Sequence, residues 1–124
     1  MATAERRAAE GRGRRAELIA AWLLRLKGYR VLARRYKTPV GEIDLIVRRG
    51  RQIAFVEVKR RDTHDDATLA VTPTGRRRIA RAAAAWLAAH PAAGDFHLRF
   101  DVVIAAPRRW PKHLAGVFDA EGNA

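Results

Sequence analysis

Charged residues interrupt two apolar runs in the segment 41–61. Asp44 lies in the first run, and Glu57 and Lys59 lie in the second, two positions apart. Charge among apolar residues is unfavourable unless another group offsets it. These three side chains are therefore the first candidates for chemistry, with Glu42 as a less favoured acid of the first run.

A hairpin of two β-strands would bring these side chains together. Side chains alternate along a strand, so Glu57 and Lys59 share one face. We expect a tight turn centred between residues 49 and 50. That register puts Asp44 opposite Phe55 and diagonally across from Glu57, about 7 to 8 Å away between backbones. The two carboxylates can then lean toward one ion.

Two carboxylates that share a site need a proton or a cation between them. At a separation of about 4 Å they repel by roughly 4 kcal/mol at an effective dielectric near 20. Oxygen ligands favour a hard ion, so Mg²⁺ or Mn²⁺ suits Asp44 and Glu57 better than Zn²⁺ does. Such an ion activates water and neutralises a phosphodiester, while Lys59 would steady the water or the transition state. The expected chemistry is phosphodiester hydrolysis, and ordinary cross-strand ion pairs are the competing interpretation.

Helix and strand patterns surround the hairpin. Apolar residues recur at three- and four-residue steps from Arg15 to Lys27, which predicts a helix that stops at Gly28. Thr72 followed by Pro73 predicts the start of a second helix, which runs to about residue 89. The predicted strands are residues 29–36, 42–48, 52–59 and 96–104. The order αβββαβ indicates an α/β fold with a mixed central sheet flanked by helices.

One domain accounts for the 124 residues, because a chain of this length supports one hydrophobic core. Residues 1–14 are rich in arginine and are expected to form a flexible basic arm. The domain is expected over residues 15–118, followed by a tail over 119–124. Apolar residues after Pro107 indicate either a last edge strand or a short cover, and the pattern does not choose between them.

The first predicted helix has two apolar faces. Its expected core stripe comprises Leu18, Ile19, Trp22, Leu23 and Leu26. Glu17 projects from nearly the opposite side, among alanines and Leu24, which points it into a partly enclosed space near the hairpin. The alternative is an ordinary glutamate at a helix N-terminus, where the helix dipole favours negative charge.

Basic residues outnumber acidic ones by 25 to 13, which gives a net charge of +12. Arginine binds phosphate oxygens in pairs, so DNA is the expected partner, and a solvated surface is the alternative. The predicted contacts to the DNA backbone are Arg60, Arg61, Arg76, Arg77, Arg78 and Arg81. The last four crowd the start of the second helix, where the dipole disfavours cations and a phosphate would offset them. Trp110 follows two arginines and is expected to pack at an edge, with stacking on a base as the alternative.

Several classes of site and location are excluded or disfavoured. The chain has no cysteine, which rules out disulfides, thiolate metal sites and cysteine nucleophiles. No apolar run approaches a membrane span, and the N-terminus lacks the apolar core of a signal peptide, so we expect a cytoplasmic protein with no membrane partner. His64, Asp65 and Asp66 are interpreted as a solvated loop rather than metal ligands. Asp101 is interpreted as a strand anchor that pairs with an arginine.

Ordered motifs in this sequence resemble the YraN family of small bacterial nuclease-like proteins over about residues 11–118. The motifs are GEIDLI at 41–46, FVEVK at 55–59, RRIA at 77–80 and FDVV at 100–103. The helical Glu17, then Asp44, then Glu57 and Lys59 resemble the site of the PD-(D/E)XK nuclease superfamily, whose core is also αβββαβ.

This resemblance implies an activity and a role for each site residue. Asp44 and Glu57 would ligate the metal, Lys59 would assist the water, and Glu17 would orient water or a second ion. Similar archaeal-type Holliday-junction resolvases suggest a divalent-metal-dependent DNA endonuclease, a homodimer, and branched or processed DNA as substrate. Relatives commonly carry Lys and Gln where this chain has Gly75 and Arg76, so those family side chains have no counterpart here.

The alternative function is a non-catalytic nucleic-acid-binding module in DNA repair, recombination or uptake. Such a module would keep the fold and deliver DNA to a helicase or recombination partner. A third and weaker alternative is a protein-interaction domain whose positive charge only aids solubility.

Overall fold

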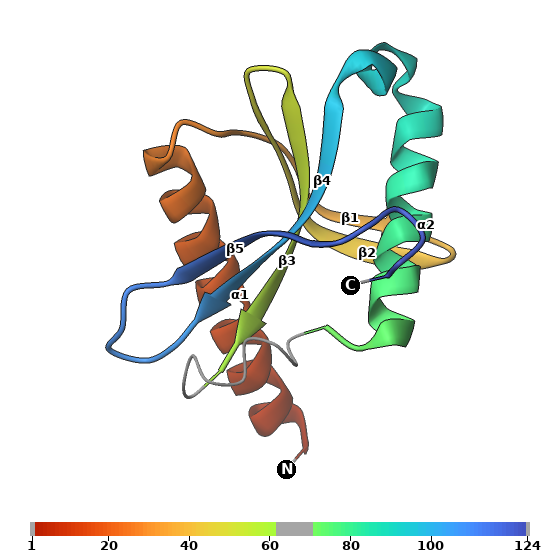
Figure 1. Ribbon diagram of the computed structural model, residues 1–124. Coiled ribbons are helices and arrows are strands. Elements are labelled where there is room, and N and C mark those ends of the chain that lie inside the picture. Colours follow the sequence, from red (N-terminus) through yellow and green to blue (C-terminus); the bar gives the residue numbers. More distant parts are fainter. Residues whose placement is uncertain (1, 62–70, 124) are drawn as a thin grey trace.

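Helices and strands follow the predicted order, with one added strand at the end. The computed structural model describes residues 2–61 and 71–123. Its elements are α1 (Ala2–Leu26), β1 (Arg30–Thr38), β2 (Gly41–Arg49), β3 (Gln52–Arg60), α2 (Pro73–Ala89), the short 3₁₀ helix η2 (Pro91–Asp95), β4 (His97–Ala105) and β5 (Lys112–Phe118) (Figure 1). The segment after Pro107 therefore contains an edge strand, one of the two forms that the sequence left open.

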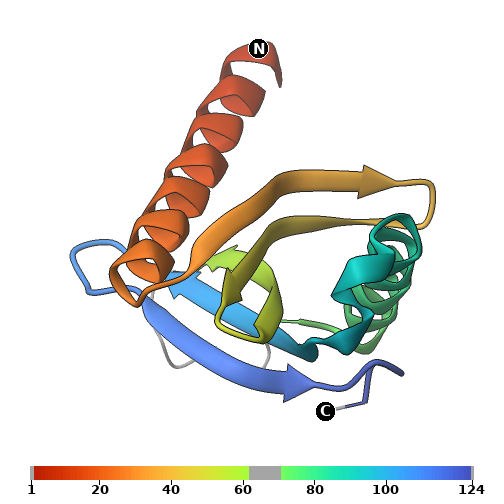
Figure 2. The same ribbon diagram turned by 90° about the horizontal axis from the view of Figure 1, so that it is seen from above.

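The described strands form one mixed sheet in the order β1-β2-β3-β4-β5. β3 and β4 run parallel, and every other neighbouring pair is antiparallel. Parallel neighbours need a crossover connection, and α2 lies within the one that joins β3 to β4. Figures 1 and 2 show α1 and α2 flanking the sheet from different sides. The predicted single α/β domain with a mixed sheet and flanking helices is confirmed.

The register of the β2–β3 hairpin corrects the prediction by two residues. The paired residues are centred between Gly50 and Arg51, not between residues 49 and 50. Gly50 has a φ of +60°, and a two-residue hairpin turn needs such a value at its first central position. A shift of two keeps every side chain on its predicted face. It also moves Asp44 from the diagonal position to the place beside Glu57.

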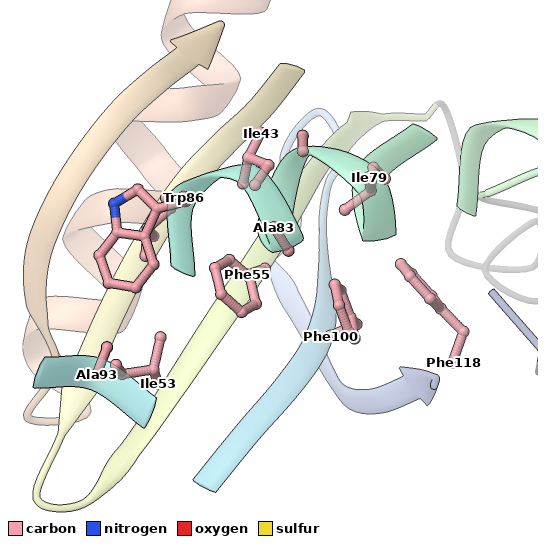
Figure 3. Close-up of a cluster of buried hydrophobic side chains, with 11 residues drawn as sticks. Ile43, Ile53, Phe55, Ile79, Ala83, Trp86, Ala93, Phe100 and Phe118 are labelled. Atoms are coloured by element: carbon pink, nitrogen blue, oxygen red, sulfur yellow. The ribbon is translucent and has the colours of Figure 1, made fainter. Parts of the chain in front are cut away.

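The helix α2 covers the larger core of the protein. Its buried residues are Ile79, Ala82, Ala83 and Trp86, as the sequence pattern predicts. They pack on aromatic rings of the sheet, where Phe55 stacks on Phe100 and meets the edge of Trp86 (Figure 3). The predicted cap is also present, because the Thr72 hydroxyl accepts the N–H of Gly75 at 3.1 Å.

The helix α1 begins at Ala2 rather than at Arg15, so the residues expected to form a flexible arm continue the helix. Alanine and arginine are strong helix formers, and an ion pair between Glu10 and Arg14 one turn apart adds support. Together they outweigh the glycines that suggested a break. Although α1 has 25 residues, no helix in the described ranges is long and apolar enough to cross a membrane.

The face of α1 that packs on the sheet is the reverse of the predicted one. Its buried residues are Ala16, Ala20, Ala21, Leu23 and Leu24. Four of the five residues of the expected core stripe, all except Leu23, are instead exposed: Leu18, Ile19, Trp22 and Leu26. The physical reason lies in the sheet, which already fills this side with side chains such as Leu45, Val47 and Val56. The space that remains between these side chains and α1 is shallow, and the small side chain of alanine fits it.

Candidate functional site

The strands β2 and β3 separate at Asp44. Their residue pairing ends at Leu45 and Val56, whereas β3 stays paired with β4 up to its last residue. The Asp44 carboxylate then takes a main-chain donor of β3, because its Oδ2 accepts the N–H of Val58 at 2.8 Å. This hydrogen bond holds the carboxylate beside Glu57.

A change of direction in β2 accompanies this fork. Ile43 and Ile46 belong to the same core cluster beneath α2, although strict alternation would place them on opposite faces. Asp44 lies between these two residues, at the point where the side chains of β2 depart from strict alternation between the faces of the sheet. The fork is therefore held by burial of Ile43 on one side of Asp44 and by the Val58 hydrogen bond on the other.

Glu57 and Lys59 share a face, as predicted. The Lys59 Nζ lies 3.1 Å from Oε1 of Glu57, and both side chains are largely shielded from solvent. Burial, followed by the charge of Glu57, raises the pKa of Asp44 to about 7, and the Val58 N–H opposes this rise. Burial also raises the pKa of Glu57, whereas Lys59 and a hydrogen bond with Asp44 lower it. The pair of Asp44 and Glu57 therefore retains a proton at pH values where an isolated carboxyl has lost it.

Glu17 approaches this pair from α1 but is held by an arginine. The Arg35 Nε donates to Oε2 of Glu17 at 2.7 Å, and this hydrogen bond raises the pKa of Arg35. The negative charges of Glu17 and Glu42 contribute to the raised pKa of Asp44, which shows that all three acids lie within electrostatic reach. Because α1 starts at Ala2, Glu17 is not at a helix N-terminus.

The donor set matches a hard cation in type but not in number. Asp44 and Glu57 offer only oxygen, and their mutual repulsion is the kind that a cation relieves. Within residues 2–61 and 71–123, however, no three His, Cys, Asp or Glu side chains are gathered closely enough to hold one ion. A metal at this place would take Asp44 and Glu57 from the protein and its other ligands from water or substrate, as Mg²⁺ often does.

The Glu57 and Lys59 side chains line a cleft of about 770 Å³. The cleft lies between the β1–β2 turn and the start of α2, and its lining includes Lys37, Thr38, Gly41, Glu42, Arg61, Thr72 and Arg78. Gly41 makes this shape possible, because a Cβ there would meet the main-chain oxygen of Arg78 at 2.6 Å. The two walls therefore touch at a position that only glycine fits.

The predicted DNA-contacting arginines divide into separate groups. Arg61 and Arg78 line the cleft, and Arg60 points to a hollow on the other side of the sheet. Arg76 donates to the carbonyls of Val71 and Gly122, so it has a structural role. Arg77 packs against Gly122, and Arg81 is exposed on α2 outside the cleft lining.

Asp101 is fully buried and pairs with Arg99, as its interpretation as a strand anchor predicts. Arg99 donates to both Asp101 oxygens at 2.7 and 2.8 Å. His113 Nε2 lies 2.7 Å from Oδ2, and the Gly116 N–H donates to Oδ1 at 3.0 Å. Burial favours a higher pKa for Asp101, but these hydrogen bonds outweigh it and lower the pKa. The network joins β4 to β5.

Two partners were missed at the level of sequence. Arg35, which holds Glu17, lies in a strand with several similar arginines, and nothing in its spacing distinguishes it. His113 is an isolated histidine whose partner Asp101 lies on the preceding strand.

Trp110 packs against Trp22, which was expected in the core, through an edge contact between the two rings. The loop interpretation of His64, Asp65 and Asp66 lies outside the described residues.

Together these features define a small α/β domain with a carboxylate pair and a lysine at a fork between two strands. The profile of "Uncharacterised protein family UPF0102" matches residues 16–105. The chain belongs to this family.

Related chains agree over most of their length. A UPF0102 protein of Methylorubrum extorquens (strain PA1) is 59% identical over 119 residues, which is 96% of this chain and 93% of the relative. A UPF0102 protein of Parvibaculum lavamentivorans is 61% identical over 103 residues, 83% of this chain and 77% of the relative. UPF0102 protein bll0669 of Bradyrhizobium diazoefficiens is 54% identical over 120 residues, 97% of this chain and 90% of the relative.

Proposed function

We propose that this protein is a divalent-metal-dependent DNA endonuclease of the PD-(D/E)XK type that hydrolyses phosphodiester bonds. One observation carries the proposal: Asp44, Glu57 and Lys59 meet where β2 separates from β3, beside a cleft with basic side chains on both walls. Branched or processed DNA is the proposed substrate.

Each residue has a task that follows from its position. A bound Mg²⁺ or Mn²⁺ would supply an activated water and charge neutralisation at the phosphate. Asp44 and Glu57 would hold the ion, and the Val58 N–H keeps the Asp44 carboxylate oriented. Lys59 lies close enough to Glu57 to hold a water by hydrogen bonding and to stabilise negative charge on the phosphate.

The surrounding charges supply DNA binding without reading sequence. Arg61 and Arg78 line the cleft together with Lys37, and all three present cations to a phosphate backbone. Glu17 acts indirectly in this proposal, since Arg35 orients it and its charge reaches Asp44. The net charge of +12 favours association at low salt.

The test is cleavage of a panel of linear duplex, flap and four-way-junction DNA by the full chain, with Mg²⁺, Mn²⁺ or chelator. We expect cutting of at least one DNA in metal, and a loss of about a hundredfold or more in Glu57→Gln. DNA binding in chelator should persist in this variant. Glu5→Gln, which removes an exposed acid at the start of α1, is the matched control. Equal cleavage by wild type and Glu57→Gln would contradict the proposal.

A second candidate is a DNA-binding module without cleavage, and the position of Glu17 favours it. Glu17 is paired with Arg35, which leaves Asp44 and Glu57 as the two acids in direct contact. This function predicts steeply salt-dependent binding to the same DNA panel and no cutting with either metal. Binding should then be indifferent to Glu57→Gln and weakened by Arg78→Ala.

A further inference from the structure

Two tryptophans form an exposed aromatic surface on the side of the protein that carries α1. Trp22 lies on α1, and Trp110 lies in the connection between β4 and β5; they are 47% and 65% exposed. Their ring centroids are 5.2 Å apart at an interplanar angle of 67°, so one ring meets the other by its edge. We call this pair the tryptophan platform. In such a contact one ring covers one face of the other, and about half or more of each side chain stays exposed.

Apolar and basic side chains extend the platform along α1. Leu18 and Leu26 lie one turn from Trp22 on each side and are also exposed. Toward the start of α1 from Trp22 is a hollow of about 210 Å³, and its lining includes Arg12, Arg15, Ile19, Arg60 and Pro107. The platform is therefore bordered by arginines that are absent from the larger cleft.

The hollow and the candidate catalytic cleft are lined by neighbouring residues at the end of β3. Lys59 lines the cleft, and the next residue, Arg60, lines the hollow. Consecutive residues of a strand point to opposite faces, so one strand end serves both surfaces.

We propose that the tryptophan platform binds single-stranded DNA by stacking unpaired bases on Trp22 and Trp110. The phosphates of that strand would contact Arg12, Arg15 and Arg60. The inference rests on the proposed function, because it assigns this surface to the single-stranded part of a branched or processed substrate. Aromatic faces beside arginines form the usual combination for binding single strands without sequence preference.

Charge disfavours a second copy of the chain as the occupant. Each copy carries a net charge of +12, so two copies repel each other as they approach. Like charges facing each other oppose association, whereas a polyanion is attracted. A single strand also explains why arginines of α1 and Arg60 of β3 line the same hollow.

The test measures binding of a fluorescently labelled oligothymidylate and of a blunt duplex to the full chain, by anisotropy in chelator at fixed salt. Trp110→Ala and Trp22→Ala should each weaken oligothymidylate binding about tenfold, and duplex binding less. Trp110→Phe should retain most of the affinity. Leu98→Ala, which removes an exposed apolar side chain of β4, is the matched control.

Unchanged oligothymidylate affinity in both alanine variants would overturn the inference. A wild-type dimer that becomes monomeric in Trp110→Ala with unchanged affinity, measured by sedimentation, would overturn it as well and assign the surface to a second copy. Because these measurements need no metal and no cleavage, their failure is distinct from failure of the nuclease test.

Discussion

The two helices contact the sheet in opposite ways. α2 buries Trp86 to 5% exposure against aromatic rings, whereas α1 leaves Trp22 47% exposed and packs with alanines. On the α2 side the sheet presents a stack of aromatic rings, and the bulky Trp86 packs against one of them, Phe55. On the α1 side branched residues already fill the surface. The sheet therefore decides which helix face is buried.

The two helices therefore have different roles, α2 in the stability of the core and α1 in recognition at the surface. The apolar side chains of α2 serve the core and fix one wall of the cleft. The large side chains of α1 contribute little to the core, so they are available at the surface. An exposed apolar group of this size marks a binding surface more often than a packing error.

The strongest test of this contrast compares the two tryptophans. Trp86→Ala should lower the free energy of unfolding by about 3–5 kcal/mol because it opens a cavity in the core. Trp22→Ala should change it by less than about 1 kcal/mol, as expected for a surface position. Urea unfolding monitored by circular dichroism measures both. Similar losses in the two variants would show that α1 is also packed through its tryptophan.

A second test adds volume instead of removing it. Ala20→Leu should destabilise the protein by about 1–3 kcal/mol, because Ala20 is fully buried against a filled sheet surface. Ala85→Leu places the same extra atoms on the exposed side of α2 and serves as the control. If Ala20→Leu were as stable as wild type, space would remain beneath α1.

A third test uses glycines on either side of the molecule. Gly41→Ala should cost about 1–3 kcal/mol and weaken DNA binding, because the new Cβ collides with the Arg78 carbonyl of α2. Gly11→Ala on α1 meets no atom within 4 Å and should stabilise the protein by up to about 1 kcal/mol, since alanine favours helix. Thermal unfolding and anisotropy report the two effects. Opposite signs are required.

A fourth test is a pH dependence on the cleft side. The pKa of Asp44 rises from 3.8 to about 7 on folding, so between these values the folded state holds a proton that the unfolded state has released. In chelator, the free energy of unfolding should therefore fall as the pH rises from about 4 to about 7 and then level off. Asp44→Asn should make this fall smaller. An identical fall in the variant would assign it to other groups.

The hairpin and the helix α2 were predictable because local rules determined them. Alternation put Glu57 and Lys59 on one face, and Thr72 with Pro73 marked the start of α2. The face of α1 was not predictable, because its two apolar faces differ only in size and the choice depends on Val47 and its neighbours in the sheet.

Long-range pairs were also beyond local reasoning. The Asp101–His113 pair needs the position of β5 beside β4, which no neighbouring residue specifies. The register of the hairpin failed for a different reason. From the sequence, a turn centred on residues 49 and 50 is as plausible as one centred on residues 50 and 51. The positive φ of Gly50, which suits the first central residue of the second turn, decides between them.

The hydrogen bond from the Val58 N–H to Asp44 links the candidate site to local opening of the backbone at Val58. Release of the carboxylate would leave the Val58 amide without its acceptor, so hydrogen exchange at this one amide should report on the closed fork. A cation that holds Asp44 in place should slow the exchange, and Asp44→Ala should speed it. Asp44→Asn keeps an oxygen acceptor and should fall between the two. A single amide signal would then follow ligation at the site in the absence of any DNA.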